Sequence, residues 1–86
     1  MKVPWRIENV KLAVTKHFAL KYMRVWGWNF HELREAIRDA YKMEKIGKEK
    51  FDIYIQKTGF KKIVTVYYDE NDRLVCITGS EGGGRK

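Results

Sequence analysis

The segment from Thr15 to Tyr41 constrains the fold most strongly, because two helical patterns follow each other there with a break between them. Thr15 is a residue type that caps the start of a helix, and Gly27 suits the left-handed position that ends one. Asn29 then opens a second pattern with Glu32 three residues later, an Asn-led version of the capping box. We therefore predict two helices joined by a tight turn.

The first predicted helix, residues 16–26, is apolar around most of its circumference, which is typical of a buried helix. Its polar residues His17, Lys21 and Arg24 are spaced i, i+4 and i+7, so a regular helix places them on one narrow strip. This strip is either the only wet face of the helix or a polar group directed into a cleft.

The second predicted helix starts at Asn29 and has an apolar stripe at helical spacing, which predicts a face packed on the core. Its other face carries one acidic line and one basic line, the latter formed by Arg34, Arg38 and Lys42. Such a divided face is typical of a solvated surface with local ion pairs, and it is also compatible with phosphate binding. His31 on this helix is predicted to be a surface residue.

The second half of the chain alternates in the manner of β-strands, with polar turns between the strands. We predict strands at 51–56, 63–68 and 73–78, with a further short edge strand at 10–14. The expected fold is α+β, with two N-terminal helices packed on a three- to four-stranded antiparallel sheet. The expected organisation is a single domain over residues 1–78 and a flexible glycine-rich tail over 79–86.

The formal net charge is +7, and residues 1–50 hold 12 Lys and Arg against 6 Asp and Glu. A basic, lopsided domain favours an anionic partner, although the charge also keeps a domain soluble. Cys76 is the single cysteine, which excludes an intrachain disulfide, and its apolar neighbours favour burial. The two histidines and the single cysteine lack the spacing of metal ligands, so we expect no metal site. The sequence also lacks a phosphate-loop or dinucleotide-binding motif, so we expect no cofactor. The sequence contains no apolar run long enough for a signal peptide or a membrane span. We therefore expect a cytoplasmic protein without a membrane partner.

Short motifs along residues 12–78 resemble the RelE/ParE-like toxin superfamily, and more closely its small branch related to BrnT. The matching residues are Thr15-Lys16-His17, Ala19, Met23, Gly27, Glu35-Ala36-Ile37, the strand Val64-Thr65-Val66-Tyr67, and Cys76-Ile77-Thr78. The sequence departs from that pattern at Phe18, which lies between His17 and Ala19 where the family has His-Ala. Trp26 and Trp28 replace the usual Arg and Ile on either side of Gly27, and losing that Arg removes a cation near the expected site.

The resemblance implies a toxin-like function, and for the RNA-cleaving members a metal-free attack of a 2′-OH on the neighbouring phosphate. His17 would then act as acid or base, because its ordinary pKa lies near neutrality. Lys21 and Arg24 would stabilise the developing charge, and Tyr67 would stack on or protonate a nucleotide. The alternative role for His17 is a hydrogen bond that ties the helix start to the sheet.

The competing hypothesis is a non-enzymatic module that binds nucleic acid or an acidic, antitoxin-like protein. The basic residues predicted to contact RNA or DNA phosphates are Arg34, Arg38, Lys42, Lys61, Lys62 and Arg73. Salt-dependent binding without scission favours this module, whereas scission that survives EDTA favours an endoribonuclease. The sequence leaves the choice between them, and the oligomeric state, open.

Overall fold

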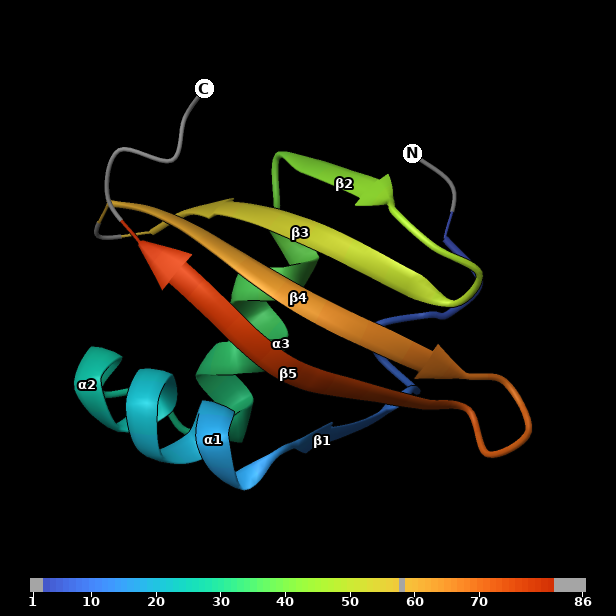
Figure 1. Cartoon of the computed structure of the whole chain (residues 1–86), viewed down its shortest axis with the longest axis horizontal. Helices are drawn as coiled ribbons and strands as arrows, with labels where there is room; N and C mark the ends of the chain where they lie inside the picture. Colours follow the sequence, from blue (N-terminus) through green and yellow to red (C-terminus); the bar gives the residue numbers. More distant parts are fainter. Residues whose placement is uncertain (1–2, 58, 82–86) are drawn as a thin grey trace.

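A computed structural model describes residues 3–57 and 59–81 as two helical segments and one five-stranded sheet (Figure 1). The elements in chain order are β1 (Lys11–Val14), α1 (Lys16–Phe18), η1 (Ala19–Met23), α2 (Arg24–Trp26), α3 (Phe30–Arg38), β2 (Lys42–Lys45), β3 (Lys50–Gln56), β4 (Phe60–Tyr68) and β5 (Arg73–Glu81). The α+β class is therefore confirmed.

The sheet has the order β1-β5-β4-β3-β2 and is mixed. Strands β2 to β5 pair antiparallel, but β1 runs parallel to β5, from Lys11 opposite Arg73 to Val14 opposite Cys76. The prediction of a three- to four-stranded antiparallel sheet was wrong in strand number and in this pairing. A parallel pair needs a long crossover connection, and the helices together with β2 to β4 supply it.

The first helical segment, residues 16–26, is continuous but contains a π-helical stretch, η1, between α1 and α2. Its start is capped by Thr15, whose hydroxyl accepts from the backbone N–H of Phe18 at 3.1 Å. Its end is the left-handed Gly27 with φ 73°. Both predicted caps are confirmed, because such signals depend only on neighbouring residues.

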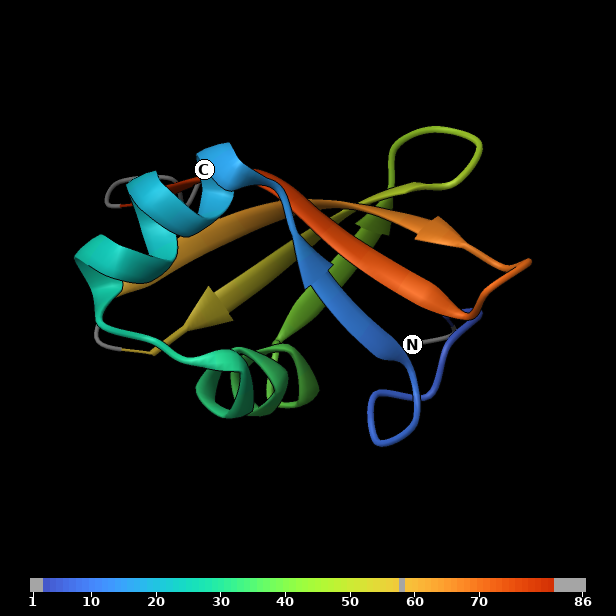
Figure 2. The same cartoon turned by 90° about the horizontal axis from the view of Figure 1, so that it is seen from below.

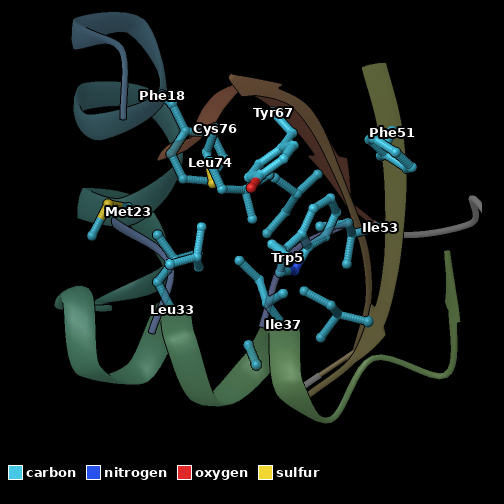
Figure 3. Packing of buried hydrophobic residues seen from close by; sticks show 14 residues of the cluster. Trp5, Phe18, Met23, Leu33, Ile37, Phe51, Ile53, Tyr67, Leu74 and Cys76 are labelled. Atoms are coloured by element: carbon cyan, nitrogen blue, oxygen red, sulfur yellow. The ribbon is translucent and has the colours of Figure 1, made fainter. Parts of the chain in front are cut away.

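Helix α3 begins with the complete Asn29–Glu32 capping box that was predicted. It ends at Arg38, earlier than the expected end near Tyr41, because the chain turns there into β2. Leu33, Ala36 and Ile37 form its buried stripe. This stripe packs with alternate residues of β3, β4 and β5 in one core that also receives Trp5 (Figure 3).

Helix α3 lies behind the sheet, and α1 to α2 lie beside the end of β5 (Figures 1 and 2). Strand β5 continues to Glu81, so residues 79–81 belong to the sheet and not to the tail that was predicted to begin at Gly79. Gly79 is needed there, because a Cβ atom would lie 2.8 Å from the carbonyl oxygen of Lys62. The rest of the predicted tail, residues 82–86, lies outside the described residues.

Candidate functional site

One face of the sheet is turned away from α3 and is not covered by any described element (Figure 1). Side chains alternate across a sheet, and the core takes Phe51, Ile53 and Ile55 from β3. The residues between them therefore lie on the opposite side, which we call the open face. The strand register places its residues in cross-strand rows: Ser80–Lys62–Tyr54–Lys42, Thr78–Val64–Asp52–Glu44, and Val75–Val66–Lys50.

Aromatic and basic side chains interleave at the β2 and β3 end of the open face. The Lys42 ammonium lies 5.2 Å from the centre of the Tyr54 ring. The Tyr41 ring packs 6.4 Å from Tyr54 and 6.3 Å from Phe60, between ring centroids. Burial raises the pKa of Tyr54, and the carboxylates of Asp52 and Glu44 raise it further, so its hydroxyl stays neutral. Lys42, Lys62 and aromatic rings thus share one exposed surface.

Asp52 is the unusual residue of the open face, because it is an acid with only 7% of its surface exposed. Its Oδ2 lies 3.9 Å from the ammonium of Lys62, which is at the outer limit of an ion pair. Its buried Oδ1 has no hydrogen-bond partner among the described residues. A buried carboxylate oxygen without a donor is costly, so Asp52 is a candidate for a functional role.

His17 is exposed and lies at the rim of the open face. Its Nε2 is 3.4 Å from the hydroxyl oxygen of Thr78, a long contact, and its ring packs edge-on against Tyr22. This position fits the alternative role that the sequence left open, a contact between the helix start and the sheet. Because Thr78 lies two strands from Asp52 in one row, their Cα atoms are about 10 Å apart.

The π-helical stretch changes the strip predicted from regular helical spacing. The rings of Phe18, Tyr22 and Trp26 stack in sequence at 5.6 and 5.3 Å, so four-residue steps return to nearly the same side of the helix. His17 and Lys21 have that spacing and stay aligned, whereas Arg24 is displaced from their line. All three are exposed.

Tyr67 does not join the other predicted catalytic residues. It is 7% exposed, packs against Trp5 in the core, and donates a hydrogen bond from its hydroxyl to Asp72 Oδ1 at 2.8 Å. This hydrogen bond raises the pKa of Tyr67. Tyr67 is paired with Leu74, four residues along β5 from Thr78, so it lies far from His17 and on the opposite face. Its contacts are therefore those of a core residue.

The six predicted phosphate contacts separate onto different surfaces. Lys42, Lys62 and Arg73 belong to the open face, as the strand register requires. Arg38 is exposed on α3, behind the sheet, and pairs with Asp39 at 3.3 Å. Arg34 donates from Nη1 to the carbonyl oxygen of Ile7 and to that of Val10, the latter at 3.0 Å, so it anchors the N-terminal segment.

Lys61 is the sixth predicted contact, and it lies away from the open face. It points to the helical side of the sheet and is only 6% exposed. Its ammonium donates to the carbonyl oxygen of Lys57 at 2.9 Å and lies 5.3 Å from the centre of the Trp26 ring. The indole N–H of Trp26 in turn hydrogen-bonds to Glu81. The alternation that turns Ile63 inward also turns Lys61 inward and Lys62 outward.

Several other site classes receive no support from residues 3–57 and 59–81. No three His, Cys, Asp or Glu side chains in these ranges are grouped to hold a metal ion. No helix in these ranges has the length and apolarity to cross a membrane. Cys76 is buried, which raises the pKa of its thiol to about 12. A shallow hollow between Pro4, Met43 and Phe51 is lined by one charged residue, Lys45.

Comparisons with protein-family models, with curated proteins and with solved structures returned no match.

Proposed function

We propose that the protein binds single-stranded nucleic acid on the open face, as a non-enzymatic module. The observation that carries this proposal is the interleaving of Lys42 and Lys62 with Tyr54 on an uncovered sheet. Lysines neutralise phosphates and release counterions, while aromatic rings stack on bases. A single strand offers both groups at once, because its bases are free to turn toward a sheet.

The charge of the open face supports an anionic occupant. Lys42, Lys50, Lys62 and Arg73 outnumber its acids, Glu44 and Asp52. Exposed apolar side chains are present as well, and Tyr41 and Tyr68 are 51% and 48% exposed. A face that is both basic and aromatic fits a strand of phosphates and bases better than it fits an apolar peptide.

The element order also bears on the proposal. Two helical segments followed by antiparallel strands is the order expected from the RelE/ParE-like resemblance, whereas β1 and its parallel pairing with β5 were not expected from it. Membership of that superfamily is part of this proposal, and its acidic antitoxin-like partner is the competing occupant of the same basic face. Binding of nucleic acid and binding of an acidic protein would then exclude each other.

Fluorescence anisotropy with a labelled uridine oligonucleotide of about eight residues tests the proposal. Lys62→Ala should weaken binding several-fold and lower the salt slope by about one, since one phosphate contact is lost. Arg38→Ala removes the same charge from α3 behind the sheet and should leave affinity nearly unchanged. No salt-dependent binding by the parent protein, or equal losses in both variants, would overturn the proposal.

A second candidate function is metal-independent RNA cleavage at His17, and one observation favours it. His17 contacts Thr78 at the rim of the open face, so an RNA bound there would pass beside the imidazole and Lys21. Scission of labelled RNA in EDTA that disappears in His17→Ala but persists in His31→Ala would support it. His31 is the matched control, because its side chain is 75% exposed on α3. Scission that persists in His17→Ala would remove His17 from the mechanism.

A further inference from the structure

The unpartnered oxygen of Asp52 indicates what the bound strand must supply. On the open face Asp52 follows Lys50 and precedes Tyr54 along β3, and it lies opposite Val64 and Glu44 on the neighbouring strands. Of these neighbours, the tyrosine hydroxyl lies 3.4 Å from Glu44 Oε1 and can donate to that oxygen. No donor among the described residues forms a hydrogen bond to Asp52 Oδ1. A ligand that completes this site must bring N–H or O–H groups.

The base edges of a single strand differ in what they offer to a carboxylate. Guanine presents two adjacent N–H donors, at N1 and N2, which match the two oxygens of one carboxylate. Uracil presents one N–H between two carbonyl oxygens. Adenine and cytosine place a ring acceptor beside their amino group, and that lone pair repels the second carboxylate oxygen. Guanine is therefore the base that satisfies Asp52 without repulsion.

We propose that Asp52 makes the open face selective for guanine in single-stranded nucleic acid, an inference that rests on the proposed function. The Watson–Crick edge of the base would donate to both Asp52 oxygens. The adjacent Tyr54 ring, already beside Lys42, would support the base by stacking. The proposal assigns Asp52 the role of a specificity residue within a surface whose lysines provide affinity.

Lys62 is the ion-pair partner of Asp52 on the open face. Its ammonium lies 3.9 Å from Oδ2 and its side chain is 39% exposed, so the pair is long and partly hydrated. Such an ion pair contributes little, and the flexible lysine side chain can turn toward a phosphate of the bound strand. That movement would free Oδ2 to accept a hydrogen bond from the base. Lys62 would thus exchange the Asp52 carboxylate for a phosphate of the bound strand.

The test compares labelled oligonucleotides of about eight residues that differ in one central base within uridines: uridine, guanosine or inosine. Inosine keeps the N1–H donor and lacks the N2 amino group. The parent protein should bind the guanosine strand about tenfold more tightly than the uridine strand, with inosine between them. Asp52→Asn should lose this preference without weakening uridine binding, and Glu44→Gln, which removes the same charge, should keep it.

The outcomes separate the two proposals. If none of the strands binds, the proposed function fails and this inference fails with it. If uridine and guanosine strands bind equally to the parent protein, the inference fails while the proposed function stands. A preference that survives in Asp52→Asn, or an inosine strand that binds as tightly as the guanosine strand, also overturns the role of Asp52. The inosine comparison uses the unaltered chain and does not depend on the folding of a variant.

Discussion

Replacing Arg34 by Met discriminates between its observed structural role and the phosphate contact predicted from the sequence. The Met side chain keeps the apolar stem but removes both hydrogen bonds to the carbonyl oxygens of Ile7 and Val10. A hydrogen bond from a charged donor contributes about 1.5–3 kcal/mol. Because one nitrogen serves both carbonyls, and water can reach them in the variant, we expect a total loss of about 2–3 kcal/mol.

A loss of this size should lower the midpoint of thermal unfolding by about 8–24 °C, since 1 kcal/mol corresponds to roughly 4–8 °C in a domain of this length. The variant should still fold, because a chain of 86 residues typically has about 4–13 kcal/mol of stability. Urea unfolding followed by tryptophan fluorescence measures the loss in free energy of unfolding, and a thermal scan with the same signal measures the shift of the midpoint. The signal includes Trp5, which is 5% exposed and lies in the segment that Arg34 anchors.

Arg38→Met is the matched control, one turn further along the same helix. Its side chain is 52% exposed and its partner is the neighbouring Asp39, so we expect no measurable change in the unfolding midpoint. Affinity for the uridine oligonucleotide should be unchanged in both variants. Unaltered stability together with weaker oligonucleotide binding in Arg34→Met would refute the structural role and restore the phosphate contact.

Two further predictions concern Gly79 and Cys76 of β5. Gly79→Ala should lower the free energy of unfolding in urea by about 1–3 kcal/mol, because its methyl group would lie 2.8 Å from the backbone oxygen of Lys62; an unchanged midpoint would contradict this packing. Cys76 should resist thiol reagents at pH 8 in the folded protein and react after unfolding, because burial raises its pKa from 9.0 to about 12. Rapid labelling of the native protein would contradict the burial of this thiol. The unfolded thiol ionises above pH 9 while the folded thiol stays protonated, so the free energy of unfolding should fall as pH rises from 9 to 12.

The features predicted correctly from sequence are those fixed by neighbouring residues. Thr15, Gly27 and the Asn29–Glu32 box act within one turn of helix, and each adopts the predicted conformation. The alternation in residues 51–56 likewise depends on one strand and its burial. The parallel pairing of β1 with β5 joins segments about sixty residues apart, and no local pattern encodes it.

The placement of the basic residues was only partly predictable. Lys61 and Lys62 are adjacent in a strand, so strand alternation already required them to lie on opposite faces. Treating both as phosphate contacts overlooked that signal. The burial of Asp52 could not be predicted for a different reason. A single acid between Phe51 and Ile53 usually faces solvent in an alternating strand. Its burial results from neighbours on β2 and β4, which only the register reveals.

The π-helical stretch η1 is best understood as one extra residue in the first helix, and deleting Leu20 tests this explanation. The turn closes from the N–H of Arg24 to the carbonyl of Ala19, five residues earlier, so it holds one residue more than an α-helical turn. Leu20 lies in the stretch and is 53% exposed, so its removal costs little burial.

Deleting Leu20 should leave a regular α-helix that packs as before. Phe18 and Trp26 would then be seven positions apart, which at about 100° per residue leaves them only about 20° from alignment, against about 80° for eight positions. We expect a cooperative urea transition with a free energy of unfolding within about 1 kcal/mol of the parent value, since Phe18 and Trp26 both keep their contacts with the core. Deleting Glu35 from the regular helix α3 is the control, because it leaves the buried Ala36 two positions from Leu33, about 160° away around the helix, and should abolish cooperative unfolding. If deletion of Leu20 is as damaging as deletion of Glu35, the π turn is required by the fold and is not an accommodated insertion.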